Sequence, residues 1–345
     1  MERYEHGGDI YGNTGVQLDF SVSTNPFGMP DTVREALMSR IDEFVNYPDP
    51  LCRELCTAIA DFENVQNDWI VCGNGAADLI YRLCFAIEPR RALVCAPTFS
   101  EYERALEQVG SEVIYHELKA ENYFDITDNL LERIDQSIDM LFLCHPNNPT
   151  GRLISCELIE LIMRRARQTG TIVLVDECFL DFTTGKSTKR FLADTPELCI
   201  LKAFTKIYAM AGLRLGYTLG SDKNLLQKIS AVAQCWSVSV PAQIAGAAAL
   251  TCDNWQKKTL DLIEEERYFL SGSIEKMGIT VYPGDANYLL LCSEKPLQEM
   301  LLSKGILIRS CANFKGLDES FYRIGIKARK ENSCLIQALE ELLYG

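Results

Sequence analysis

Five apolar runs recur along the middle of the chain, and most are separated by stretches with helical spacing. They are "RALVCAP" (91–97), "EVIYHEL" (112–118), "DMLFLCH" (139–145), "TIVLVDE" (171–177) and "LCILKAF" (198–204). The stretch "ELIELIMRRARQTG" (157–170) has apolar residues at helical intervals and ends at Gly170, as helices often do. Near-continuous apolar strands that alternate with helices indicate a mostly parallel sheet covered on both faces. The pattern therefore predicts an α/β fold.

The pattern differs at the two ends of the chain. Residues 1–30 are rich in Gly, Asn, Thr and Pro and predict an irregular arm, which is followed by helices over about 31–44 and 50–63. After about residue 253, a long charged helix leads into short strands and a final helix, which is typical of an α+β unit. We expect an N-terminal arm (1–30) that packs with the small domain, a large domain (31–245) and a small domain (246–345), with the change near 240–255.

Charge and hydropathy narrow the classes of partner. The net charge of the 345 residues is -14, which argues against a nucleic-acid partner because phosphate binding needs a surplus of Lys and Arg. No apolar stretch approaches the roughly twenty residues of a membrane span. The first residues, "MERYEHGGDIYGN", also lack the apolar core of a signal peptide. We expect neither nucleic acid nor a membrane as a partner.

The cysteines do not form a metal-binding pattern. Fourteen are scattered along the chain without a Cys-x-x-Cys pair, and there are three histidines, His6, His116 and His145. We therefore expect no metal site. Several cysteines lie in or beside apolar runs, where a reduced thiol packs as a small hydrophobic group. Such usage is typical of a reducing, cytoplasmic setting.

Two loops with special backbone chemistry follow apolar runs. The run "WIVC" (69–72) precedes Gly73 and Gly75, and a helix is predicted from about Ala76. Glycines before a helix N-terminus can cradle a phosphate, although a plain glycine turn has the same sequence. The rigid loop "HPNNPTG" (145–151) follows another run, and adjacent asparagines between prolines are unusual turn filler. Ligands of open parallel sheets bind beyond the carboxyl ends of strands, where both loops would lie.

Charged residues follow the next two runs. Asp176 ends an apolar strand, and a buried carboxylate needs a partner, which is either a backbone cap or a cationic ring nitrogen. Thr205 and Lys206 follow 198–204, and a lysine in a partly dry site loses its proton more easily and can attack carbonyls. Arg214 offers a fixed fork for a phosphate dianion. Together these groups meet the needs of pyridoxal 5'-phosphate: an aldehyde partner, a ring-nitrogen partner and a phosphate site.

Motifs along nearly the whole chain resemble one known family. They are "HGGDI" (6–10), "LDFSVSTNPFGMP" (18–30), "LFLCHPNNPTGRL" (141–153), "FTKIYAMAGLRLGY" (204–217), "TVYPGDANYLLL" (280–291), "ILIRSCANFKGLD" (306–318) and "FYRIGIKARKEN" (321–332). The chain is similar to the fold-type I pyridoxal-phosphate enzymes of the aminotransferase class I/II group. Within this group it resembles the threonine-phosphate decarboxylases of cobalamin biosynthesis most, and the histidinol-phosphate aminotransferases next. The resemblance implies a seven-stranded sheet, a small α+β domain and a homodimer with a shared active site.

The resemblance implies roles for residues around the cofactor. Lys206 would bind the cofactor aldehyde, Asp176 would pair with the ring N–H, and Asn148 would hydrogen-bond the phenolic oxygen. Tyr102 in "PTFSEY" would stack on the ring, although ordinary helix packing is an alternative for this tyrosine. The phosphate would be held by Gly75, Ala76, Ala77, Thr205 and Arg214, and by Tyr47 ("NYPDP") from the neighbouring subunit.

The resemblance also implies how a small amino-acid phosphate substrate is bound. Arg323 would bind its carboxylate, and His6 and Asn25 would approach it from the arm. A histidine in a mobile arm can instead be simply solvated. Lys327 is either a second anion contact or an ordinary surface lysine.

The sequence predicts a reaction and one alternative. The first hypothesis is decarboxylation of L-threonine O-3-phosphate or L-serine O-phosphate to an amino-alcohol phosphate and CO2. The alternative is an aminotransferase of the histidinol-phosphate type. Phe179 stands where these aminotransferases usually carry a tyrosine, and the missing hydroxyl favours the first hypothesis. Tyr11 and Asp285 stand where we expect basic residues in the decarboxylases, and this loss of positive charge would weaken a phosphate site.

Overall fold

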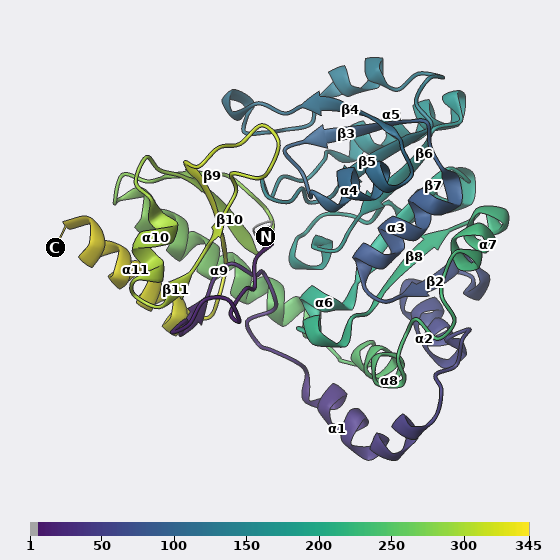
Figure 1. Ribbon diagram of the computed structural model, residues 1–345, viewed down its shortest axis with the longest axis horizontal. Coiled ribbons are helices and arrows are strands. Elements are labelled where there is room, and N and C mark those ends of the chain that lie inside the picture. Colours follow the sequence, from purple (N-terminus) through teal and green to yellow (C-terminus); the bar gives the residue numbers. More distant parts are fainter. Residues whose placement is uncertain (1–5, 345) are drawn as a thin grey trace.

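A seven-stranded sheet forms the centre of the larger part of the molecule (Figure 1). The computed structural model describes residues 6–344. The strands are β2 (Ile70–Gly73), β3 (Arg91–Ala96), β4 (Glu112–Glu117), β5 (Met140–Cys144), β6 (Ile172–Asp176), β7 (Leu198–Ala203) and β8 (Gly216–Gly220). Their order is β2-β8-β7-β6-β5-β3-β4; β8 runs antiparallel to both neighbours, and the other pairs are parallel. The prediction of a mostly parallel sheet is confirmed.

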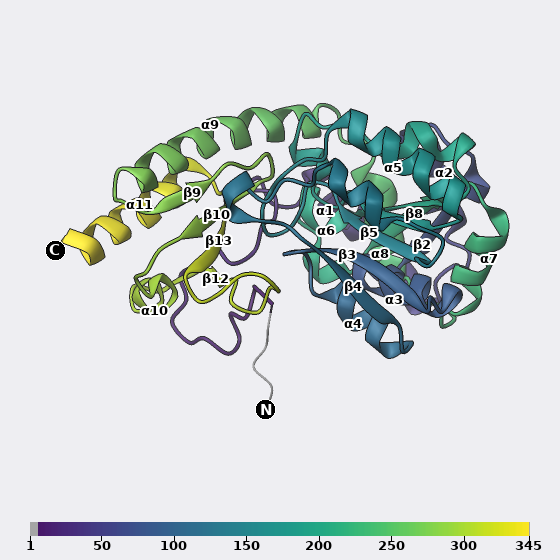
Figure 2. The same ribbon diagram turned by 90° about the horizontal axis from the view of Figure 1, so that it is seen from above.

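Helices cover both faces of this sheet. They include α2 (Arg53–Glu63), α3 (Ala76–Ile87), α4 (Glu101–Gln108), α5 (Cys156–Thr169) and α7 (Lys223–Ala231). Figure 2 shows α3 and α4 on one side of the sheet and α5 and α2 on the other. Every residue of β5 and β7 is therefore buried, which explains why their sequences are apolar apart from Lys202 of β7. None of the helices in residues 6–344 combines the length and the apolar character needed to span a membrane.

Helix α5 has the ends that its sequence predicts. The hydroxyl of Ser155 accepts a hydrogen bond from the Leu158 N–H at the start of the helix. Gly170 follows the last turn with φ 74°, a left-handed conformation that glycine adopts without strain. These local signals place the helix where the sequence predicted it, over 157–170 within one residue.

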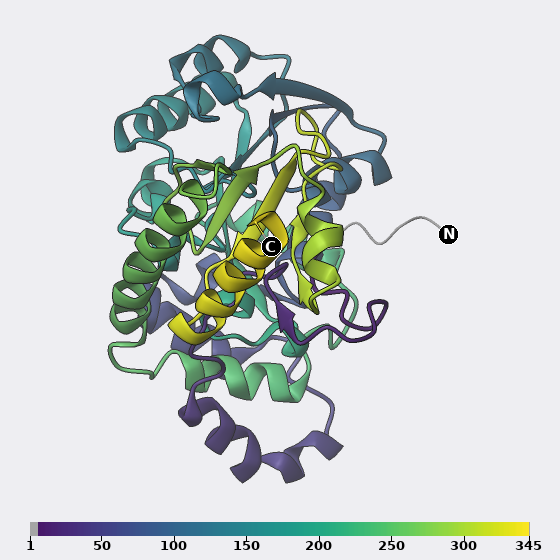
Figure 3. The ribbon, with the colours of Figure 1, turned by 90° about the vertical axis from the view of Figure 1, so that its left-hand side faces the viewer.

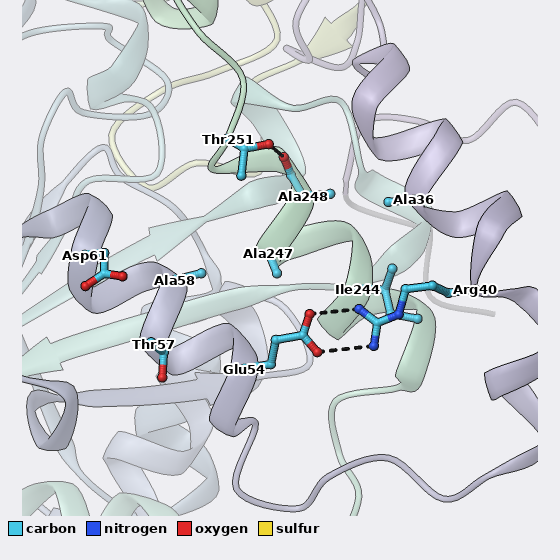
Figure 4. Close-up of a pocket in the computed structure, with 10 residues that line it drawn as sticks. All are labelled: Ala36, Arg40, Glu54, Thr57, Ala58, Asp61, Ile244, Ala247, Ala248 and Thr251. Atoms are coloured by element: carbon cyan, nitrogen blue, oxygen red, sulfur yellow. Dashed lines mark hydrogen bonds and ion pairs between the residues drawn. The ribbon is translucent and has the colours of Figure 1, made fainter.

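Helix α1 (Asp31–Ser39) is shorter than the helix predicted over 31–44, so that expectation is wrong at its C-terminal end. The chain continues as a 3₁₀ segment, Ile41–Val45. Between them, the Arg40 guanidinium donates to Glu43 and to Glu54 of α2. In Figure 4, Arg40 and Glu54 face each other beside a groove of about 420 Å³ that is also lined by small residues of α8 (Val240–Ala249). The change from α-helix to 3₁₀ segment thus falls at a residue whose side chain also pairs with α2, a contact that local spacing does not predict.

A second, four-stranded antiparallel sheet lies in the C-terminal part of the chain. Its strands, in order, are β12 (Arg309–Ser310), β13 (Phe321–Gly325), β10 (Tyr288–Cys292) and β9 (Thr280–Tyr282). Figure 3 shows α11 (Arg329–Tyr344) between α9 (Trp255–Glu275) and α10 (Leu297–Leu302). The arm joins this part through β1 (Leu18–Asp19), which pairs in parallel with β11 (Ile306–Leu307). Arm and C-terminal part are therefore held together by backbone hydrogen bonds.

Helix α8 crosses the predicted boundary between residues 245 and 246. It packs against α1 and α2, whereas α9 begins six residues after the end of α8 and packs against α11. We propose that the boundary between the large and small domains lies after α8, within the predicted interval 240–255. We keep as a proposal that the residues before α1, 1–30, form an N-terminal arm.

Candidate active site

A cavity of about 490 Å³ lies at the carboxyl edge of the large sheet. Its walls come from the arm, from the ends of β5, β6 and β7, from the start of α3 and from strands β12 and β13. Nine of the predicted site residues line it: His6, Ala76, Ala77, Asn148, Asp176, Thr205, Lys206, Arg214 and Arg323. The fold therefore brings together groups from both ends of the chain.

Lys206 lies in the one-turn helix α6 (Phe204–Ile207), which follows β7 directly. Burial, followed by the positive charge of Arg323 and then of Arg214, lowers the pKa of Lys206 to about 8. Its Nζ lies 5.5 Å from the centroid of the Phe179 ring, which also lines the cavity. A substantial fraction of Lys206 is therefore neutral near pH 8, which is the form that attacks a carbonyl group.

Asp176 ends strand β6 and is buried, with 5% of its surface exposed. Its Oδ1 accepts a hydrogen bond from the Cys178 N–H (2.9 Å), and its Oδ2 accepts one from the Tyr102 hydroxyl (2.7 Å). Burial raises the pKa of Asp176, and these two hydrogen bonds oppose the rise. A carboxylate buried in this way strongly favours a cationic group placed beside it in the cavity.

An anion cradle forms where α3 begins. Gly75 is the N-terminal cap with φ +88°, and no side chain caps the first N–H groups of the helix. The free N–H groups of Ala76 and Ala77 therefore point at a ligand together with the positive end of the helix dipole. The buried hydroxyl of Thr205, from the strand end beside them, lines the same cavity.

The pairing of β2 with β8 brings Arg214 to this cradle. Gly73 pairs with Gly216, so the residues that follow β2 and those that precede β8 meet at the same place. A Cβ atom added to Gly75 would lie 2.7 Å from the Arg214 Nη2. The glycine thus lets the guanidinium approach the backbone, and any larger residue at position 75 would push it away.

The two asparagines of the loop 145–151 have different tasks. Asn147 fixes the loop: its side chain accepts from the Thr98 hydroxyl and donates to Pro97 O and the Thr150 hydroxyl. Asn148 lines the cavity, where its Oδ1 accepts a hydrogen bond from the Arg323 Nη1. The resemblance assigned Asn148 to the cofactor, and Asn148 is the one of the two that lines the cavity.

Arg323 is buried beside the cavity. Its Nη2 donates to Ser21 O (2.9 Å), while its buried Nε has no hydrogen-bond partner among residues 6–344. A buried guanidinium with an unsatisfied N–H calls for an anionic ligand. Burial lowers the pKa of Arg323, but an arginine stays charged at neutral pH.

The "HGGD" segment closes the cavity from the arm. The His6 Nε2 forms a hydrogen bond with Glu101 Oε1 at 2.8 Å, so His6 is not simply solvated. The Gly8 N–H donates to the Ser21 hydroxyl (2.7 Å). A Cβ at Gly7 would lie 2.3 Å from Ser21 O, so a side chain at position 7 would force the arm outward. The paired glycines thus allow the arm to pack against β1 and its continuation.

Four predicted residues do not line this cavity: Gly75, which caps α3 beside it, Tyr102, Asn25 and Tyr47. Tyr102 packs flat against Phe142 (centroids 5.0 Å apart) and donates to Asp176, so its stacking on the cofactor ring stays a prediction; Phe99 is the aromatic residue of this segment that lines the cavity. Asn25 is buried, and its Nδ2 donates to Ile207 O and the Thr259 hydroxyl, which ties the segment after Lys206 to α9. Asn25 therefore holds the structure together in this conformation, and its contact with the substrate stays a prediction.

Tyr47 also lies away from the cavity of its own chain. It is 78% exposed and stacks on Trp236 at a centroid distance of 4.5 Å. The predicted contact of Tyr47 with the phosphate of a neighbouring subunit's cofactor stays a prediction.

The residues that departed from the family pattern occupy different places. Phe179 lines the cavity, with its ring edge-on to Tyr288. The hydroxyl of the tyrosine that the aminotransferases usually carry at this position is therefore absent from the wall of the cavity. Tyr11 borders the cavity but is 93% exposed. Asp285 does not line the cavity; its Oδ2 accepts from the Leu153 N–H, and Lys327 also lies outside the lining. The negative charge of Asp285 therefore does not enter the site.

Sequence reasoning missed Arg309. It lies on β12 directly opposite Arg323 of β13 and lines the same cavity. Its Nη2 donates to Asn313 Oδ1 (2.6 Å), and its guanidinium lies 5.4 Å from the Phe314 ring. The available signal was a lone charge at the end of the apolar run "ILIRSC". Two arginines on neighbouring strands give the site more positive charge than the sequence predicted.

The residues present fit pyridoxal phosphate. The cradle of Gly75, Ala76, Ala77, Thr205 and Arg214 suits a phosphate, Asp176 suits a protonated ring nitrogen, and Lys206 suits the aldehyde. The unsatisfied Nε of Arg323 leaves an anion site beyond these groups. A single cavity can therefore hold the cofactor and an anionic substrate together.

The chain is similar to known proteins in both sequence and fold. The family model "Aminotransferase class I and II" matches residues 16–342. The chain is 39% identical to a threonine-phosphate decarboxylase of Salmonella typhimurium, a match that covers 99% of this chain and 97% of that protein. Its fold is similar to the crystal structure of a histidinol-phosphate aminotransferase from Clostridium acetobutylicum (TM-score 0.88, 30% identity, 94% of this chain and 98% of that one). It is also similar to an L-threonine-O-3-phosphate decarboxylase from Porphyromonas gingivalis (TM-score 0.85, 25% identity, 95% and 100%).

Proposed function

Because the chain belongs to the aminotransferase class I and II family of pyridoxal-phosphate-dependent enzymes, we propose that it is a decarboxylase of a phosphorylated hydroxy-amino acid. The substrate would be L-threonine O-3-phosphate or L-serine O-phosphate, and the products an amino-alcohol phosphate and CO2. The observation that carries the proposal is the similarity to the Salmonella decarboxylase along the whole chain. Phe179 in the wall of the cavity and the second arginine, Arg309, support it.

The residues of the cavity have separate tasks in this proposal. When bound, pyridoxal phosphate supplies an electron sink for the bond that breaks at the α-carbon of the substrate. The negative charge of Asp176 keeps a proton on the ring nitrogen, and Asn148 orients the phenolic oxygen. Lys206, with a pKa of about 8, can hold or release a proton beside the α-carbon.

The two arginines decide how the substrate is oriented. The bond that breaks is the one that stands perpendicular to the cofactor ring. A carboxylate held by Arg323 is fixed away from that direction, which suits removal of the α-proton. A phosphate that spans Arg309 and Arg323 leaves the carboxylate free to stand perpendicular, as decarboxylation requires. We therefore expect both arginines to bind the phosphate of the substrate.

Product analysis tests the proposed reaction. The purified enzyme is incubated with L-threonine O-3-phosphate, L-serine O-phosphate and histidinol phosphate in parallel, with and without 2-oxoglutarate. We expect CO2 release from at least one of the first two compounds. No CO2 from either would reject the proposal. Amino transfer from histidinol phosphate would establish the alternative, an aminotransferase, which the fold similarity to the Clostridium enzyme favours.

Replacing Arg309 with Gln is expected to lower kcat/KM for the phosphorylated substrate by about 10- to 100-fold, since a hydrogen bond to a charged group contributes about 1.5–3 kcal/mol. The same change should affect the unphosphorylated amino acid much less, because the lost partner is the phosphate. The exposed Lys330→Gln variant is the matched control for loss of one positive charge. An equal loss with both substrates would show that Arg309 only supports the structure.

The rate at which apoprotein binds the cofactor covalently should increase with pH and level off above a midpoint near 8. Lys206 attacks only when neutral, and its pKa lies at about 8, so the neutral fraction grows as the pH rises through that value. Stopped-flow absorbance measures the rate. In the Arg323→Gln variant the midpoint should move up, because a positive charge that lowers the pKa is gone. A wild-type midpoint at the ordinary value of 10.5 would contradict the assignment.

We propose that the enzyme is a cytoplasmic homodimer with shared active sites. Large apolar side chains are exposed along one surface, here called the apolar rim: Met38, Ile41, Val45, Tyr47, Leu51 and Trp236. Such a surface supports association with a second copy. The fourteen cysteines, all without disulfides, support a reducing compartment.

Mixed dimers test the shared site. If Tyr47 contacts the partner's cofactor, homodimers of the Lys206→Ala variant and homodimers of the Tyr47→Ala variant should both have little activity. A mixed dimer of the two variants contains one intact site. Refolding the two variants together should restore about a quarter of the wild-type activity, since half of the dimers carry one good site of two. No recovery in the mixture would show that each chain forms its site alone.

A further inference from the structure

A second cavity, of about 290 Å³, gathers four of the fourteen cysteines. It lies between α2, β2 and the loop after α7, and the cysteines in its wall are Cys52, Cys56, Cys72 and Cys235. Cys52, Cys56 and Cys72 are buried, while Cys235 is exposed. The cofactor and substrate site does not use any of these thiols, and its lining shares no residue with this cavity.

Two of these thiols are in direct contact. Cys56 on α2 and Cys72 on β2 place their Sγ atoms 3.7 Å apart. The hydrogen bond with Cys72 lowers the pKa of Cys56, whereas the neighbouring thiols of Cys52 and Cys56 and then burial raise the pKa of Cys72. Cys56 is therefore the thiol that ionises first, and Cys72 is the neighbour that stays protonated beside it.

We propose that Cys56 and Cys72 form a modification site at which a small hydroperoxide produces an intramolecular disulfide. The Cys56 thiolate attacks one peroxide oxygen; the O–O bond breaks, and with one proton the second oxygen leaves as water or an alcohol. The Cys72 sulfur then attacks the oxidised Cys56 sulfur: an S–S bond forms, the S–O bond of Cys56 breaks, and the first oxygen leaves as water with the proton of the Cys72 thiol. The two sulfurs lose two electrons in total, which reduce the peroxide. Hydrogen peroxide is small enough to enter a cavity of this volume.

The disulfide would act on the anion cradle. Bond formation shortens the distance between the two sulfurs from 3.7 Å to about 2.05 Å and so pulls β2 and α2 together. Cys72 is three residues before the cap Gly75, and the intervening Gly73 is tightly packed: a Cβ there would lie 2.6 Å from Leu79 Cγ. A movement of Cys72 should therefore also shift the N–H groups at the start of α3. This consequence rests on the proposed cofactor site, whereas the disulfide itself does not.

Peptide mapping tests the covalent step independently of activity. The full-length protein is treated with hydrogen peroxide, alkylated and digested, and we expect a Cys56–Cys72 cross-linked peptide that disappears after dithiothreitol. Cross-links from Cys72 to Cys52, links to Cys235, or no link at all would overturn the proposal. Because this experiment uses the wild-type protein, it does not depend on a variant that folds.

Cofactor affinity tests the consequence. Peroxide should weaken pyridoxal-phosphate binding to the apoprotein by about tenfold, reversibly with dithiothreitol, since displacements on the order of 1 Å cost up to about 100-fold at positioned sites. Cys56→Ser and Cys56→Ala should be insensitive, and the exposed Cys334→Ser should behave like the wild type. A cross-link without any change in affinity would overturn the coupling to the cradle. Equal sensitivity in the Cys56 variants would also overturn it.

Discussion

Replacing Lys206 with Ala is expected to lower turnover by about 10³-fold or more, because the variant loses both the amine that binds the cofactor aldehyde and a proton carrier at the α-carbon. Wild-type protein reduced with borohydride should carry the cofactor on the peptide that contains Lys206, and the variant should carry none there. Mass spectrometry of the digested protein measures this directly. The protein should still fold, since the Lys206 side chain faces the cavity and pairs with no carboxylate among residues 6–344.

The exposed Lys330→Ala variant is the matched control and should keep both activity and the labelled peptide. If the Lys206→Ala variant kept normal turnover and carried the cofactor on another lysine, the assignment of Lys206 as the residue that binds the cofactor aldehyde would be wrong. Noncovalent binding of the cofactor should survive in part, because the cradle around Gly75 and Arg214 is untouched by the change.

Replacing Lys202 with Met is expected to be the most destabilising single change, by about 3–5 kcal/mol in the free energy of unfolding. Lys202 is buried on β7, and its Nζ lies 3.3 Å from Glu63 Oε1 and 3.5 Å from Asp181 Oδ1. Although burial alone would lower the pKa of Lys202, Asp181, Glu63 and Glu177 raise it, so the lysine is charged. Its loss leaves the buried Glu63 with less compensation.

Urea denaturation followed by circular dichroism measures the loss. The double variant Lys202→Met, Glu63→Gln should recover part of the lost stability, because it removes the buried charge that the single change leaves behind. Lys189→Met is the control within the same cluster: Lys189 also contacts Glu63 (2.8 Å) but is partly exposed, so its loss should cost less. A loss below about 1 kcal/mol for Lys202→Met would contradict the role of this cluster.

The same cluster predicts how stability depends on pH. Burial alone would raise the pKa of Glu63, but Lys202, Lys189 and the Tyr217 hydroxyl lower it from 4.5 to about 2. A lowered carboxylate pKa contributes stability that is present above pH 4.5 and is lost as the pH falls towards 2. The contribution is about 3 kcal/mol, and it should be absent in the Glu63→Gln variant.

The sequence by itself determined the fold and the cofactor half of the site. Asp176, Thr205 and Lys206 each follow a continuous apolar run, and a residue directly after a buried parallel strand must lie at the carboxyl edge of the sheet. Likewise, glycines before an apolar helical stretch locate the anion cradle. Local pattern fixes such positions because strand direction and helix polarity are local properties.

Only the tertiary structure decided where the side chains lie whose neighbours are far away in the chain. Tyr102 turned towards Asp176 and Phe142, Asn25 towards Thr259, and Arg309 towards Arg323 and the cavity. The sequence around each of them is compatible with packing, substrate binding or surface exposure. The choice depends on side chains more than ten residues away that meet only when the arm, the large sheet and the small sheet pack together. Strand ends can therefore be read from a pattern, whereas the substrate half of this site is a product of packing.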